Sequence, residues 1–236
     1  MSVNQAVILA EWRARALASH RSAALAAEYL SWLLRLRYSP DLLQQAHGFV
    51  GACLDRADLC WEVHDALGGG DDPLQAEEGV FRIPQAPGQP TAERIVVAGF
   101  ALWCVGCTVG EPLWAAMTER ATEAAPKAAL DRIAALAPDQ SAFGWAVLDE
   151  ALDRDREGGL AALMTSMPRT FAEAERSWGR VPGDWIEPVG PKEQRYGLIP
   201  RTRYKREFYQ AIAERVLPLL DERNVDGRVA WGKRTA

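Results

Sequence analysis

Apolar residues recur along most of the chain at the three- and four-residue steps of a helix. From Asn4 to Arg37, Ala, Leu and Trp keep this spacing with no internal Pro or Gly, which predicts a first helix. Ser39-Pro40-Asp41 then makes a short break, with proline placed in the first turn of the next helix. A second helix is expected over Leu42–Leu67, where a run of glycines ends it.

The rest of the chain alternates between helical and irregular patterns. Asp71–Pro90 is rich in Pro, Gly and acidic residues and predicts a long connection that crosses the molecule. Helices are expected over 91–125, over 126–155 with a kink or break at Pro138, and over 200–221. Prolines and glycines among scattered aromatics predict an irregular segment over 158–197, and the last dozen residues are expected to be loose.

The length and apolar content of the chain are sufficient for one sizeable core. The chain has 236 residues, of which 48% are hydrophobic. We therefore expect a single all-α domain over 1–236, with a helical bundle over about 4–155, the irregular segment over about 156–199 and a C-terminal helix over about 200–222. Its two helical hairpins are joined by a long crossover, which differs from a simple up-and-down arrangement.

Short motifs in both halves resemble a bacterial family of ferritin-like bundles, the di-iron carboxylate proteins. They are Ser19-His20-Arg21-Ser22, Ser39-Pro40-Asp41-Leu42, Ala46-His47, Leu59-Cys60-Trp61, Cys104-Val105-Gly106-Cys107-Thr108, Leu130-Asp131-Arg132-Ile133-Ala134, Trp145, Tyr196-Gly197-Leu198 and Val216-Leu217-Pro218. The resemblance is most continuous between residues 15 and 150. It implies a ferritin-like four-helix bundle with an extra C-terminal helix and the irregular segment.

The metal ligands of that family are replaced in this chain. A di-iron site needs a carboxylate from each of two helices and a Glu-x-x-His pair from each of the other two. By the resemblance, those positions hold Ser19, then Cys53 with Arg56, then Cys107, then Ala137 with Gln140. Because Arg56 puts a fixed positive charge where a cation would bind, the resemblance implies a protein with neither iron nor another bound metal, and no other cofactor is expected.

The replacement of large ligands by smaller groups predicts a pocket in the middle of the bundle. Its expected walls are Trp61, Trp103 and Trp114, and its expected polar groups are Ser19, Cys53, Arg56, Cys107 and Gln140, with Glu111 one turn beyond Cys107. In an enzyme, Arg56 would hold an anionic oxygen or lower the pKa of a thiol, Cys53 or Cys107 would act as nucleophile or acid/base group, and Gln140 would bind a carbonyl. Ser19, Trp61, Trp103 and Glu111 would contact the substrate.

Three functions from different classes are consistent with these residues. The first is a metal-independent enzyme acting on a small organic molecule, which the family resemblance associates with specialised metabolism. The second is a non-catalytic scaffold whose core has simply been refilled, although Arg56 would then need to reach solvent or pair with Glu28 or Glu111. The third is a thiolate-bound copper, zinc or redox protein using Cys53 and Cys107. We favour the enzyme.

The net charge limits the binding partners that we expect, and the lack of a recognisable secretory signal bears on the expected location. The formal net charge of −5 argues against sequence-independent binding of nucleic acid, and the basic run Arg201–Arg206 is interpreted as a solvated helix start. Neither a secretory signal nor a run of about 18 uninterrupted apolar residues is seen, so we expect a cytoplasmic protein that makes no membrane contact. The four cysteines are then predicted to be free thiols, and a homodimer formed through a bundle face is left open.

Overall fold

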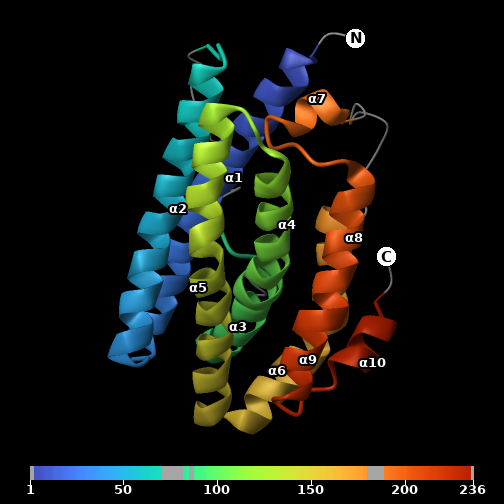
Figure 1. Ribbon diagram of the computed structural model, residues 1–236. Helices are drawn as coiled ribbons and strands as arrows, with labels where there is room; N and C mark the ends of the chain where they lie inside the picture. Colours follow the sequence, from blue (N-terminus) through green and yellow to red (C-terminus); the bar gives the residue numbers. More distant parts are fainter. Residues whose placement is uncertain (1–2, 71–81, 85–87, 180–188, 235–236) are drawn as a thin grey trace. The chain divides into compact units, whose positions relative to one another are not determined.

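The computed structural model describes residues 3–70, 82–84, 88–179 and 189–234. Every regular element in these ranges is a helix, as the sequence predicts, and no strand occurs there (Figure 1). The α-helices are α1 (Gln5–Arg35), α2 (Pro40–Ala66), α3 (Thr91–Gly99), α4 (Gly106–Arg120), α5 (Ala124–Arg154), α6 (Arg156–Ala174), α7 (Pro191–Gln194), α8 (Arg201–Ala211), α9 (Leu217–Asp221) and α10 (Gly227–Gly232). Three π-helical segments interrupt them: η1 (Phe100–Val105), η2 (Glu175–Gly179) and η3 (Ile212–Val216).

The described chain forms two compact units. Unit 1 consists of Met1–Pro84, Trp114–Leu136 and Glu187–Pro200, and unit 2 of Gln85–Leu113, Ala137–Ile186 and Arg201–Ala236. The helices α4 and α5 each contribute residues to both units. We describe each unit by itself.

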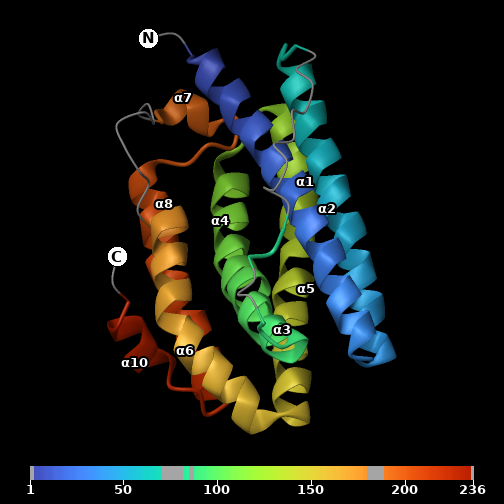
Figure 2. The same ribbon diagram turned by 180° about the vertical axis from the view of Figure 1, so that it is seen from behind.

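Unit 1 is built on the antiparallel hairpin of α1 and α2, which lie side by side in Figures 1 and 2. The Asn4 side chain caps α1 by accepting from the backbone N–H of Val7, and Pro40 opens α2. Between them the turn needs a left-handed residue, Arg37, whose φ is 53°. The buried face of the hairpin includes Trp12, Tyr29, Leu33, Phe49, Ala57 and Val63.

Unit 2 has an aromatic core contributed by helices far apart in the sequence. Phe171 of α6 packs edge-on against Phe100 of η1 and against Trp231 of α10, with ring centroids 5.7 and 5.2 Å apart. Phe208 of α8 contacts the same tryptophan at 6.3 Å. These contacts hold α10 beside α6, as Figure 2 shows.

Three details predicted from the sequence differ from the structure. The segment over 158–179 is not irregular, because α6 and η2 make it helical, and residues 180–188 of the same prediction lie outside the described residues. The chain end is not loose throughout, since α10 is capped by Asp226 and its neighbour Arg234 pairs with the buried Glu175. Pro138 does not break α5, which continues on both sides of it. The crossover predicted over 71–90 falls mostly outside the described residues.

One continuous helix, Thr91–Arg120, is long and apolar enough to cross a membrane by length and composition alone. Its most apolar stretch has a mean hydropathy of 1.6, and 61% of that stretch is buried inside the protein. A buried core helix passes the same test, so the location of the protein stays a prediction.

Candidate functional site

The eight residues predicted to form one site are divided between the two units. Unit 1 contains Ser19, Cys53, Arg56 and Trp61, and unit 2 contains Trp103, Cys107, Glu111 and Gln140. That all eight line a single pocket stays a prediction. The geometry within each unit is nevertheless informative about the chemistry available there.

In unit 1, three of the predicted residues are joined by hydrogen bonds around Arg56. Its Nε donates to the Oγ of Ser19 at 3.1 Å, and its Nη2 donates to the Sγ of Cys53 at 3.5 Å. The Ser19 hydroxyl in turn donates to the backbone carbonyl of Arg15 at 2.8 Å. The indole of Trp114 lies 6.0 Å from the Arg56 guanidinium carbon, within reach of a cation–π contact. The α1–α2 hairpin thus brings a serine, a thiol and a guanidinium together.

The two carboxylates considered as partners of Arg56 have other contacts. Glu28 accepts a hydrogen bond from the backbone N–H of Ile83 at 2.8 Å. In unit 2, Glu111 accepts from Nη2 of Arg215 at 2.6 Å, a contact not foreseen from the sequence. Any substrate contact of Glu111 would therefore compete with this ion pair.

Trp61 lies five residues after Arg56 on α2, and its place in the predicted pocket stays a prediction. Five residues along an α-helix correspond to a rotation of about 140°, so Trp61 and Arg56 project from different sides of α2. Its ring instead contacts the ring of His64, edge-on, with centroids 5.1 Å apart. Trp114 is one tryptophan that the structure places near the guanidinium of Arg56.

A second arginine of unit 1, not singled out by the sequence, is buried near the same cluster. Arg15 is only 7% exposed. Its Nε donates to Glu11 at 3.1 Å, its Nη2 donates to the carbonyl of Gly197 at 3.0 Å, and its guanidinium carbon lies 4.7 Å above the ring of Trp12. Its Nη1 is buried and has no hydrogen-bond partner among the residues that the structure describes.

The thiols of unit 1 are protonated at neutral pH. Burial raises the pKa of Cys53, and the nearby charge of Arg56 only partly offsets this effect. Burial likewise raises the pKa of Cys60 to about 11, although Arg15 and Arg56 both act in the opposite direction. The expectation that Arg56 would activate a thiolate is therefore not met at Cys53, which is better suited to donate a proton than to attack as a nucleophile.

In unit 2, a buried hydrogen-bond network lies next to Cys107 and Gln140. The hydroxyls of Thr108 and Ser141 are 2.9 Å apart, and Nε1 of Trp145 donates to Thr108 at 3.0 Å. Thr108 directly follows Cys107 in α4, and Ser141 directly follows Gln140 in α5. The hydrogen bond between their hydroxyls therefore holds α4 against α5 next to both predicted site residues. Cys107 itself is half-buried, with its Sγ 3.9 Å from the carbonyl of Leu102.

Trp103 of unit 2 is buried in a close helix contact. An added Cβ on Gly144 would lie 2.6 Å from the carbonyl carbon of Trp103 and 2.7 Å from the backbone nitrogen of Cys104. Only glycine permits this approach of α5 to η1. The contact holds the backbone of the segment that carries Trp103 and Cys104.

All four cysteines are free thiols, which confirms that prediction. Across the described ranges, no group of three or more His, Cys, Asp or Glu side chains is arranged to hold a metal ion. The thiolate-metal hypothesis for Cys53 and Cys107 stays untested, since the two residues belong to different units.

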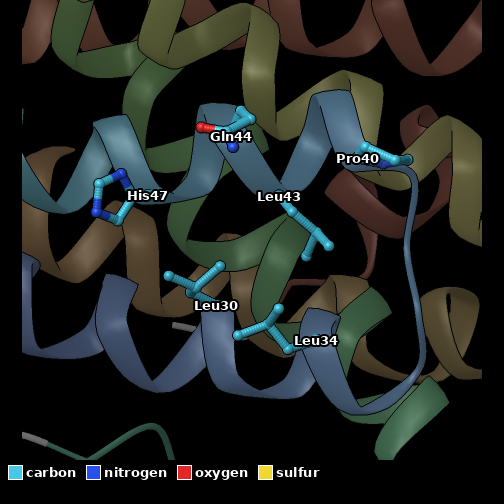
Figure 3. Close-up of a pocket in the computed structure, with 6 residues that line it drawn as sticks. All are labelled: Leu30, Leu34, Pro40, Leu43, Gln44 and His47. Atoms are coloured by element: carbon cyan, nitrogen blue, oxygen red, sulfur yellow. The ribbon is translucent and has the colours of Figure 1, made fainter.

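Unit 1 also has a shallow groove at the turn end of the α1–α2 hairpin, shown in Figure 3. It encloses about 440 Å³ and is lined by Leu30, Leu34, Pro40, Leu43, Gln44 and His47. The groove is open to solvent and mostly apolar, and none of the predicted site residues lines it.

Comparison of the chain with protein families, with curated proteins and with solved structures found no match.

Proposed function

We propose that this chain is a ferritin-like four-helix bundle without a di-iron site, and that it acts as a metal-independent enzyme on a small organic molecule bound beside Arg56. The all-helical architecture and the order of the long helices are consistent with such a bundle. The family resemblance supports an enzyme of specialised metabolism, and its cytoplasmic location stays an expectation from the sequence.

One observation carries the proposal: the guanidinium of Arg56 donates hydrogen bonds to the side chains of both Ser19 and Cys53. By the resemblance, these positions in α1 and α2 hold metal ligands in the family. Here they present a guanidinium, which repels a cation but binds the polar oxygen of an organic molecule. Arg56 has other interactions besides these two, so a bound oxygen would join an existing network.

The residues of unit 1 are sufficient for a polar, acid-assisted step. Arg56 would bind and polarise a substrate oxygen, the neutral thiol of Cys53 would supply a proton, and Ser19 would orient the guanidinium by accepting its hydrogen bond. The face of Trp114 would pack against an apolar part of the molecule. Cys107 and Gln140 lie in unit 2, and this proposal does not require them.

A ligand screen on the full chain tests the proposal. The melting temperature is measured with a panel of small neutral alcohols, amides and ketones and of carboxylic acids, for the natural protein and for Arg56→Met. The matched control is Arg35→Met, which removes an exposed arginine from the last turn of α1. Compounds that bind are then incubated with the protein and followed by mass spectrometry for conversion to product.

We expect at least one compound to stabilise the natural protein and the Arg35→Met variant. Because a hydrogen bond to a charged group contributes about 1.5–3 kcal/mol, its affinity for Arg56→Met should be about 10- to 100-fold lower. Binding that is equally strong in Arg56→Met would refute the proposed site. If compounds bind but none is converted, the result would indicate a protein that carries a small molecule and does not transform it.

A further inference from the structure

The register of the α1–α2 hairpin places a second arginine beside the cluster of Ser19 and Arg56. The two helices are antiparallel, and the hydrogen bond from Arg56 to Ser19 fixes which residues are level with each other. One turn further along both helices, Arg15 comes level with Cys60. Arg15 and Arg56 therefore approach the same part of the hairpin from opposite helices, which lie side by side in Figure 1.

The donors of Arg15 are not all used. Its Nε and Nη2 bind Glu11 and the carbonyl of Gly197, whereas Nη1 is buried and without a partner in the described part of the chain. The side chain is 6% exposed, so water reaches little of it. A buried cationic N–H that makes no hydrogen bond is costly, and its cost is removed by an acceptor that carries negative charge.

The described groups around Arg15 supply further donors and an aromatic face. The thiol of Cys60 keeps its proton up to a pKa of about 11, so it presents no anion to either arginine at neutral pH. Trp12 covers one face of the guanidinium. Glu11, whose side chain is 41% exposed, is already bonded to Nε and Nη2. The side chain of Leu130 packs against Gly197 near Nη1: a Cβ added to Gly197 would clash with Cδ1 of Leu130 and lie 3.7 Å from Nη1.

We propose that unit 1 contains an oxyanion-binding site at Nη1 of Arg15, and that the substrate of the proposed enzyme carries a carboxylate or a phosphate group that binds there. The inference rests on the proposed function and gives its substrate class. A guanidinium is suited to this role because it stays charged, and its Nη1 presents two N–H donors fixed in the plane of the group.

The first test uses simple anions as probes of the full chain. At constant ionic strength set with potassium chloride, the melting temperature is followed while acetate, benzoate or inorganic phosphate replaces chloride. We expect a saturable rise of about 5 °C or more at about 100 times the Kd, in the natural protein and in the Arg35→Met control. A preference for acetate and benzoate identifies a carboxylate substrate, and a preference for phosphate identifies a phosphate ester.

Two variants of Arg15 keep the test decisive. In Arg15→Met the rise should disappear. Arg15→Lys keeps the positive charge but has one nitrogen in place of three, so it cannot keep the bonds to Glu11 and Gly197 and also present the donors of Nη1; it should bind the anion at least ten-fold more weakly even if Arg15→Met does not fold. The inference is overturned if no anion stabilises the natural protein beyond chloride, or if Arg15→Lys binds as tightly as the natural protein.

The outcomes also separate this inference from the proposed function. If neutral compounds bind in an Arg56-dependent way while no anion binds, the enzyme proposal stands and the oxyanion site is wrong. If anions bind through Arg15 but no organic acid or phosphate ester is converted, the oxyanion site stands and the enzyme proposal is wrong.

Discussion

Replacing Gly144 by alanine is the sharpest test of the packing in unit 2. Gly144 lies in the middle of α5, where alanine is intrinsically favoured over glycine by about 1 kcal/mol. From helix propensity alone the substitution should stabilise the protein. The structure predicts the opposite, because the new Cβ would lie 2.6 Å from the carbonyl carbon of Trp103 and 2.7 Å from the nitrogen of Cys104.

The size of the effect follows from what would have to move. Ordinary van der Waals contacts of a Cβ begin at 3.4 Å, so α5 and η1 would have to separate by several tenths of an ångström. The two atoms belong to backbone and cannot rotate away. Overpacking of this kind costs about 1–3 kcal/mol, and we take the upper end. After the gain in helix propensity is subtracted, Gly144→Ala should lower the free energy of unfolding by about 2 kcal/mol.

Gly51 provides the matched control. It lies in α2, it is exposed, and nothing comes within 4 Å of its added Cβ. Gly51→Ala should therefore raise the melting temperature by about 2–4 °C, whereas Gly144→Ala should lower it by about 4–8 °C. Both are measured by thermal and urea unfolding. Equal stabilisation by the two alanines would show that α5 and η1 do not approach as closely as described.

Three further predictions concern titration, the chain end and the buried network. Folding raises the pKa of Cys60 from 9.0 to about 11, so between these pH values the folded chain keeps a proton that the unfolded chain releases. The contribution of Cys60 to the free energy of unfolding is therefore fully present below pH 9 and is lost between pH 9 and 11. Urea unfolding at a series of pH values should show this loss as a fall of up to about 3 kcal/mol. Cys60→Ala should lack this part of the fall, and identical pH slopes would contradict the assignment. Glu175→Gln should lower the free energy of unfolding by about 3 kcal/mol, because it removes the carboxylate that pairs with Arg234. Trypsin should then cleave the C-terminal end of the chain faster, and an unchanged cleavage rate would argue against the ion pair. Thr108→Val should cost about 2 kcal/mol in urea unfolding by removing the acceptor of Trp145, and Thr108→Ser should cost much less.

The long helices were predictable from sequence because their buried faces repeat at helical spacing. The prediction failed over 158–179, where Gly158 and Pro168 were interpreted as helix breakers. Gly158 lies in the first turn of α6, where its backbone N–H donates to the cap Asp155 at 3.0 Å. Pro168 is accommodated in the helix interior, next to the buried Phe171 and its contacts with distant aromatic rings. Those rings come from residues far along the chain, and no local pattern shows them.

The candidate site was predictable only in part. The family resemblance grouped Ser19 with Arg56, and the structure joins them by a hydrogen bond. Arg15 had a visible signal, because it is a charged residue at helical spacing between Trp12 and Ser19 on an otherwise apolar face. Its partner Gly197 was not predictable, since 182 residues separate the two in sequence.

The division of the chain into units has a consequence for how the protein can be cut. Each unit consists of three separate stretches, and these alternate along the sequence, so the chain passes from one unit to the other five times. Two of these passages lie inside the helices α4 and α5. Neither unit can therefore be expressed by itself as a continuous fragment, and a truncation at either end removes residues from a unit whose other parts lie far away in sequence. The shortest continuous piece that contains all of unit 1 is 1–200, and the shortest that contains all of unit 2 is 85–236, so each must carry a large part of the other unit with it.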